Sequence, residues 1–124
     1  MPDTPPAALR GLRVLVIEDE FLIALDLLLI LDDLGCVALG PAATVPEALH
    51  LLAADPPEAT LLDLNLDGAS TAPVAEALAA CGVPFATVTA YAIRPGPVFD
   101  GVPAIAKPFR AEQIKDALLG LARR

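Results

Sequence analysis

Five polar side chains each stand at the end of a short apolar stretch, although these stretches lie far apart in the chain. The five are Glu18, Asp19, Asp63, Thr89 and Lys107. If the fold brings them together, the three carboxylates repel one another unless a cation lies among them. Mg²⁺ is suited to that place, because it binds one or two carboxylates, keeps several waters and bridges to phosphate. Ammonium and hydroxyl groups are suited to phosphate oxygens, so these residue types indicate chemistry on a phosphoryl group.

The apolar stretches that precede these side chains have the composition of buried β-strands. They are short, and several are rich in β-branched residues, as strands covered on both faces are. We predict strands over 13–17, 37–39, 59–62, 85–89 and 104–106. Gly40-Pro41 is expected to close the second of them.

The segments between the predicted strands have helical spacing of their apolar residues. We predict helices that end at about Leu34, Ala54, Ala80 and Leu121. Gly35 and Gly82 are expected to terminate two of these helices. Thr44 is a predicted N-cap, and Glu47, three residues on, is its capping-box partner. Residues 93–103 contain three prolines and two glycines, which predicts a loop or a single helical turn in place of a helix.

Strands that alternate with helices and lack hairpin signals predict an α/β fold with a parallel sheet covered on both faces. Right-handed crossovers then make the sheet doubly wound, and ligands of such sheets bind at the carboxyl ends of the strands. All five polar side chains named above lie at, or directly after, the carboxyl end of a predicted strand. The sequence therefore predicts a single site at that edge.

The composition limits what else the chain could do. Its 124 residues suffice for one domain, which we place at 12–124 after a flexible leader at 1–11. Eight basic against sixteen acidic residues give a net charge of −8, which argues against nucleic-acid partners and anionic membranes. No secretory signal or membrane-spanning stretch is evident, and Cys36 and Cys81 are expected to be buried free thiols. We therefore expect a cytoplasmic protein.

Four stretches of the chain resemble the motifs of the receiver domains of two-component response regulators, the CheY-like superfamily. They are Val14-Leu-Val-Ile-Glu-Asp19, Leu61-Leu-Asp-Leu-Asn65, Val88-Thr-Ala-Tyr91 and Ala106-Lys-Pro-Phe109. They occur in the order of that family and extend over nearly the whole chain. The resemblance implies a flavodoxin-like, five-stranded parallel sheet with the strand order 2-1-3-4-5.

The resemblance also implies roles for particular residues. Asp63 would accept a phosphoryl group from a histidine kinase or phosphotransfer protein. Glu18 and Asp19 would bind Mg²⁺ together with Asp63, and Asn65 would add its backbone carbonyl. The protein would then be a phospho-acceptor that catalyses its own phosphorylation and slow dephosphorylation, and not an enzyme with turnover.

Further roles implied by the resemblance concern the last two predicted strands. Thr89 would hydrogen-bond the phosphoryl group, with Thr87 as the competing candidate, and Lys107 would pair with it. A cis peptide bond would precede Pro108. Asn65, Ala90 and Tyr91 would influence the lifetime of the phosphorylated state or sense it.

The chain departs from most receivers at the fifth predicted strand. Ala104 stands where these proteins carry an aromatic switch residue, and Tyr91 is the nearest aromatic substitute. The chain thus resembles a divergent group with a threonine-glycine-tyrosine-like motif, here with Ala90 in the place of the glycine, and with a reduced fourth helix. These departures concern the output surface and not the phosphorylation site.

The first predicted helix has two apolar stripes where a helix on a sheet needs one. One stripe should pack on the sheet, and the other comprises Leu22, Leu25, Leu28 and Leu29. We interpret the second stripe as a contact surface for a kinase helix bundle or for a second copy of the chain. Burial beneath the leader or the last helix is the alternative.

Other functions fit the sequence less well. The segment after Asp63 mimics a calcium-binding EF-hand loop, but Val74 stands where that loop needs a glutamate. A phosphatase with an aspartate nucleophile would need an acid where Asn65 stands. A metal-dependent hydrolase would need a general base near Asp63. The main alternative is a pseudo-receiver that binds a partner or dimerises without phosphorylation.

Overall fold

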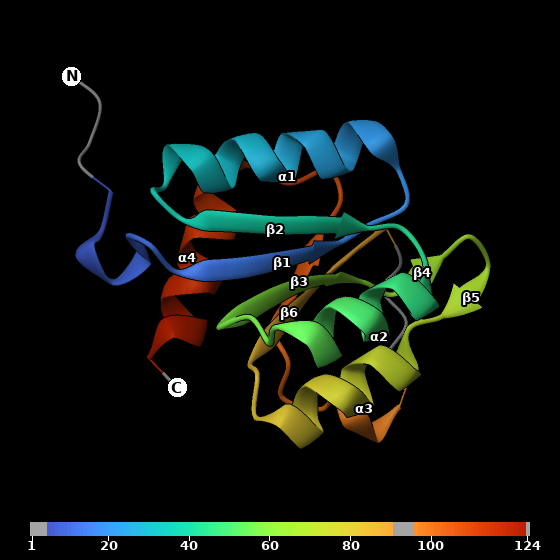
Figure 1. Cartoon of the computed structure of the whole chain (residues 1–124). Helices are drawn as coiled ribbons and strands as arrows, with labels where there is room; N and C mark the ends of the chain where they lie inside the picture. Colours follow the sequence, from blue (N-terminus) through green and yellow to red (C-terminus); the bar gives the residue numbers. More distant parts are fainter. Residues whose placement is uncertain (1–4, 91–95, 124) are drawn as a thin grey trace.

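The computed structural model describes residues 5–90 and 96–123 (Figure 1). Its main sheet is parallel and has the order β2-β1-β3-β6-β7. The strands are β1 (Arg13–Ile17), β2 (Val37–Ala42), β3 (Ala59–Asp63), β6 (Phe85–Thr89) and β7 (Ala104–Ala106). Numbered as predicted from the sequence, this is the order 2-1-3-4-5, which confirms the predicted α/β fold.

Among the described residues, four helices cover the two faces of the sheet. They are α1 (Phe21–Asp33), α2 (Val45–Ala54), α3 (Ala72–Cys81) and α4 (Ala111–Ala122). Side chains of α1 and α4 share one hydrophobic cluster with the sheet, and those of α2 and α3 share the other, so the two pairs lie on opposite faces (Figure 1). Successive side chains of β1 point to opposite faces of the sheet. Val14 and Val16 therefore belong to the first cluster, and Leu15 and Ile17 belong to the second.

The predicted helix ends are confirmed. Gly82 ends α3 in the left-handed conformation at φ 72°, and Gly35 follows α1 at φ 80°. The Oγ1 of Thr44 accepts a hydrogen bond from the Glu47 amide at 3.2 Å. The Glu47 carboxylate accepts one from the Ala43 amide at 2.7 Å, one residue before the predicted partner.

Strand β2 runs three residues further than predicted, to Ala42, through Gly40-Pro41. A proline is tolerated here because β2 is an edge strand and needs hydrogen-bond donors on one side only. Gly40 has φ +90°, and a Cβ atom at this position would lie 2.8 Å from the Val16 carbonyl oxygen. Gly40 thus allows the edge strand to approach β1 closely.

Part of the predicted leader belongs to the packed domain. A short 3₁₀ segment, η1, spans Ala7–Leu9, and Leu9 is completely buried among side chains of α1 and α4. The proline-rich composition concealed this, because one apolar residue makes no periodic signal. Cys36 is buried as predicted, but Cys81 is exposed at the end of α3, contrary to the expectation of two buried thiols.

Between β3 and α3 the chain forms a two-stranded antiparallel hairpin, which was not predicted from the sequence. Its strands are β4 (Asn65–Leu66) and β5 (Ala69–Ser70). Asp67 and Gly68 form the turn with φ values of 50° and 83°. Two consecutive residues with positive φ characterise a type I′ turn, for which Asp-Gly is a favoured pair.

The predicted irregular connection after β6 is confirmed in its described part, 96–103; residues 93–95 of the predicted loop lie outside the described residues. The only regular structure within 96–103 is a 3₁₀ segment, η2 (Pro97–Phe99). Phe99 is buried, and its ring meets that of Phe85 edge to face, with centroids 6.3 Å apart. Phe99, together with Val98 and Val102, packs this segment against the second hydrophobic cluster without a regular helix.

Candidate functional site

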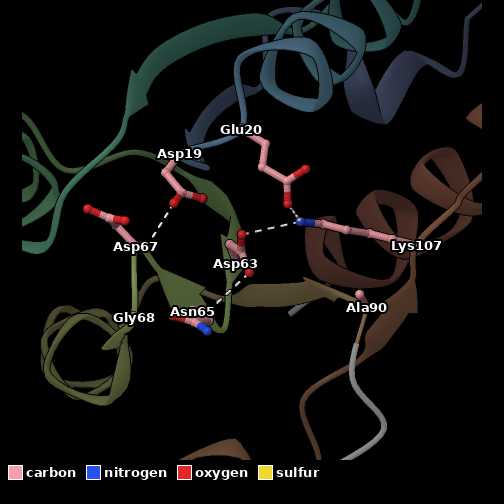
Figure 2. A pocket seen from close by; sticks show the side chains of 8 residues that line it. All are labelled: Asp19, Glu20, Asp63, Asn65, Asp67, Gly68, Ala90 and Lys107. Atoms are coloured by element: carbon pink, nitrogen blue, oxygen red, sulfur yellow. Dashed lines mark hydrogen bonds and ion pairs between the residues drawn. The ribbon is translucent and has the colours of Figure 1, made fainter.

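The predicted side chains converge at the carboxyl end of the sheet, where β1 and β3 lie side by side. After β1 the chain crosses to β2 on one side of β1, and after β2 it returns to β3 on the other side of β1. The gap between β1 and β3 is therefore the topological switch point of the sheet. A cavity of about 190 Å³ opens here (Figure 2). Its lining residues are Asp19, Glu20, Asp63, Asn65, Asp67, Gly68, Ala90 and Lys107.

Asp63 stands at the last position of β3 and lies at the centre of this group (Figure 2). Its carboxylate is nearly buried and has two different neighbours. Oδ1 accepts a hydrogen bond from the Asn65 amide at 3.1 Å, and Oδ2 lies 3.2 Å from the Lys107 ammonium. Asp63 is thus fixed in position while it faces the cavity.

Lys107 is the only basic residue that lines the cavity in the described part of the chain. Its Nζ lies 2.8 Å from Glu18, 3.2 Å from Asp63 and 3.6 Å from Glu20. Burial alone would lower the pKa of Lys107, but the Glu18 and Asp63 carboxylates outweigh burial and raise it. Lys107 is therefore a permanent positive charge at this site.

Glu18 is the most buried acid of the group, 2% exposed. Its Oε2 accepts a hydrogen bond from the Glu20 amide at 3.1 Å, and its Oε1 forms the ion pair with Lys107. Burial, and next the neighbouring Asp63, raise the pKa of Glu18 to about 7, although Lys107 and the Glu20 amide act in the opposite direction. Near neutral pH this carboxyl group is poised between its two protonation states.

The hairpin fixes Asp19 from the other side of the cavity. The Asp67 amide donates a hydrogen bond to Asp19 Oδ2 at 2.8 Å (Figure 2). The left-handed turn at Asp67 and Gly68 aims this amide toward β1. Asp19 is therefore held beside Asp63, although the two residues come from different strands.

The donor set of the cavity suits Mg²⁺. Four carboxylates line it against one ammonium group, and this excess of hard oxygen donors and negative charge favours a divalent cation. Oxygens of Glu18, Glu20 and Asp63 lie within 4.8 Å of one another, but the Lys107 ammonium already lies among these three carboxylates. Asp19, Asp63 and Asn65 line the cavity beside this cluster and would hold the ion there. Glu18, which the resemblance also made a ligand, does not line the cavity and pairs with Lys107 instead.

The two threonines of β6 have different surroundings. Thr87 donates from Oγ1 to the Pro103 carbonyl at 3.4 Å and pairs with Ala104 within the sheet. Thr89 is buried at the last position of β6, and its carbonyl accepts a hydrogen bond from the Lys107 amide at 2.9 Å. Thr89 therefore lies two residues nearer than Thr87 to the carboxyl end of β6 and next to Lys107, although neither threonine is among the residues that line the cavity. Tyr91 lies outside the described residues.

Two side chains of the cavity were not predicted from the sequence. Glu20 had no predicted role, yet its carboxylate lies 3.6 Å from Lys107 Nζ. Asp67 had no predicted role either, yet its amide donates a hydrogen bond to Asp19. The Asp67-Gly68 pair is a hairpin signal that could have located the turn over the site, whereas the reach of Glu20 depends on its side-chain conformation.

The second apolar stripe of α1 is largely exposed. Leu22 is 76% and Leu29 57% exposed, and Leu25 is exposed at 40%. Leu28 differs, because it is half-buried and packs against the core. Phe21, which the prediction omitted, is 75% exposed and extends the stripe. Within 5–90 and 96–123, neither η1 nor α4 covers these side chains.

No helix in the described part of the chain is long and apolar enough to span a bilayer.

The parallel sheet of this order has acids after β1 and at the end of β3, and a lysine followed by a cis proline after β7. These features define a CheY-like receiver domain. The predicted cis bond before Pro108 is confirmed. No protein-family model matches the chain, and no curated protein sequence matches it either. Comparison with solved structures identifies its relatives.

The chain is similar to the receiver domain of the response regulator PhyR from Erythrobacter litoralis, with 31% identity and a TM-score of 0.78 over 93% of this chain and 92% of that one. The chain therefore belongs to the response regulator receiver domains. It is 34% identical to PhyR from Brucella abortus over 93% of its length, with a TM-score of 0.75. It spans about half of that protein, 49%.

A third similar structure is the receiver domain of a modulated diguanylate cyclase from Desulfovibrio desulfuricans. The identity is 27% and the TM-score 0.77, over 90% of this chain and 93% of that domain. Receiver domains that belong to different response regulators thus share this fold with the chain.

Proposed function

We propose that this receiver accepts a phosphoryl group on Asp63 and transmits the phosphorylated state through protein–protein contacts. The observation that carries the proposal is the Asp63 carboxylate, which faces an acidic cavity 3.2 Å from the Lys107 ammonium. Phosphoryl transfer needs positioning and charge neutralisation more than acid–base groups, and this site supplies both.

The donor is a phosphohistidine of a histidine kinase or a phosphotransfer protein. A carboxylate oxygen of Asp63 attacks the phosphorus atom, the P–N bond breaks, and its electron pair remains on the imidazole nitrogen, which takes up a proton. Lys107 neutralises charge on the transferred oxygens, and Thr89 donates a hydrogen bond to them. Mg²⁺, when bound by Asp19, Asp63 and the Asn65 carbonyl, would supply the remaining positive charge.

The product is an aspartyl phosphate that the domain hydrolyses slowly. The protein is in this proposal a phospho-acceptor of the cytoplasm and not an enzyme with turnover. Asn65 and Ala90 border the cavity, so they are placed to influence how water reaches the phosphoryl group.

Incubation with Mg²⁺ and acetyl phosphate, followed by intact-mass measurement, tests the proposal. Wild-type protein should gain one phosphoryl group, and Asp63→Asn should gain none. Asp100→Asn, on the exposed end of η2, is a matched control and should be labelled like the wild type. No adduct on wild type, together with no binding of beryllofluoride, would contradict the proposal.

That negative result would favour the pseudo-receiver, which binds a partner without phosphorylation. One structural feature supports partner binding whether or not the protein is phosphorylated. The exposed stripe of α1 offers Leu22, Leu25 and Leu29 to a partner. The partner in our proposal is the helix bundle of the kinase, and a second copy of the chain is the alternative. Sedimentation of wild type and Leu29→Glu distinguishes the two, because equal monomeric masses exclude the dimer.

A further inference from the structure

Glu20 differs from the other two carboxylates around Lys107. Glu18 and Asp63 are nearly buried, and their oxygens lie 2.8 and 3.2 Å from the ammonium. The Glu20 side chain is 62% exposed and its oxygen lies at 3.6 Å, which is an ion pair but too long for a hydrogen bond. Glu20 is therefore the one of the three that can leave without exposing a buried charge.

The position of Glu20 leaves its side chain free for this contact. Glu20 is the N-cap residue of α1, but its side chain forms no capping hydrogen bond with the helix. Instead it lies between two cavities, because Glu20, Ala90 and Lys107 line both the acidic cavity and a second one of about 350 Å³. Glu20 and Lys107, whose ion pair Figure 2 draws, therefore border both cavities.

Phosphorylation changes the charge balance around Lys107. The acceptor side chain passes from a carboxylate with one negative charge to an acyl phosphate with about two. This group attracts Lys107 more strongly than the carboxylate did and repels Glu20. Glu18 cannot move aside, since it is buried and held by the Glu20 amide.

We propose that Glu20 is a positioning residue that competes with the phosphoryl group for Lys107. In the unphosphorylated protein Glu20 holds the ammonium group toward α1, and it releases the ammonium when a phosphoryl group arrives. Glu20 thereby lowers the affinity of the site for phosphoryl groups. This inference rests on the proposed function, because it assigns a regulatory residue to the same site.

Binding of beryllofluoride, a phosphoryl mimic, in the presence of Mg²⁺ tests the inference, with ¹⁹F NMR as the signal of the bound form. Glu20→Gln should bind it about two- to fivefold more tightly than wild type, the range for loss of one exposed ion pair. Glu20→Asp keeps the charge but is one methylene too short to reach Lys107, and should show the same increase. Asp26→Asn removes another exposed acid of α1, which has no ion pair with Lys107, and should bind like wild type.

Mg²⁺ titration of the same variants without beryllofluoride, followed by calorimetry, separates the inference from its rivals. A loss of Mg²⁺ affinity in Glu20→Gln by tenfold or more would make Glu20 a metal ligand and overturn the inference. If affinity for beryllofluoride increased in Glu20→Gln but not in Glu20→Asp, the negative charge near the site and not the contact with Lys107 would explain the effect. This result would also overturn the inference. Unchanged affinities in both variants would do the same. Failure of wild type to bind beryllofluoride would instead contradict the proposed function itself.

Discussion

The stability of the metal-free protein should fall as the pH rises from 5 to 8, because of Glu18. Burial raises the pKa of this carboxyl group from 4.5 to about 7. The folded state therefore binds a proton that the unfolded state has already released, and folding is favoured at low pH. The contribution of Glu18 is fully present below pH 4.5 and is lost as the pH rises through 7.

The size of the effect follows from the two pKa values. At pH 5 the folded protein carries a protonated Glu18 while the unfolded chain is mostly ionised, and at pH 8 both are ionised. With 1.36 kcal/mol for each pKa unit, the free energy of unfolding should decrease by about 2–3 kcal/mol over this interval. Lys107, Asp63 and the Glu20 carboxylate face Glu18, and Lys107 keeps its charge throughout because its own pKa is raised.

Urea denaturation of wild type and Glu18→Gln in EDTA measures this effect. Glutamine cannot titrate, so the difference in unfolding free energy between the two proteins should change by about 2–3 kcal/mol between pH 5 and 8. A difference that stays constant over this range would refute the assignment.

Other predictions concern the frame of the site and the core. Gly40→Ala should lower the free energy of unfolding by about 1–3 kcal/mol, because its Cβ would lie 2.8 Å from a carbonyl oxygen and its φ is positive. Gly120→Ala is the control: Gly120 lies in α4 with open space around it, so this variant should raise the free energy of unfolding by about 0.5–1 kcal/mol in the same urea titration. Leu9→Ala should cost about 2–5 kcal/mol if the second half of the leader is part of the core, and a loss below about 0.5 kcal/mol would contradict that packing. Asp19→Asn should weaken Mg²⁺ binding at least about tenfold by calorimetry without changing the unfolding midpoint in EDTA by more than a few degrees, and unchanged Mg²⁺ affinity would exclude Asp19 as a ligand.

The positions of the strands and of the acids at their ends could be predicted because both depend on local sequence. A run such as Val14–Ile17 is apolar throughout and is followed by acids. The parallel topology alone then brings Asp19 and Asp63 to one edge. Lys107 follows by the same reasoning from β7. Chain direction and residue type were sufficient for these side chains.

The features that escaped prediction depend on contacts that leave no periodic pattern. The strands of the hairpin at Asn65–Ser70 have two residues each, too few for an alternation to be visible. The approach of Glu20 to Lys107 is set by the conformation of two long side chains. Leu9 is a single apolar residue among prolines, and only the position of α4 shows what buries it.

The edge strand β7 is the part of the sheet with the least support. It has three residues and one strand neighbour, and Ala104 and Ala106 are exposed while Ile105 alone is buried. Local opening needs the least free energy where few buried contacts are lost, so amide hydrogens of β7 should exchange earlier than those of β1 and β3. Lys107 directly follows this strand. The ammonium group that pairs with the carboxylates of the site is therefore attached to the strand that we expect to unfold locally most often.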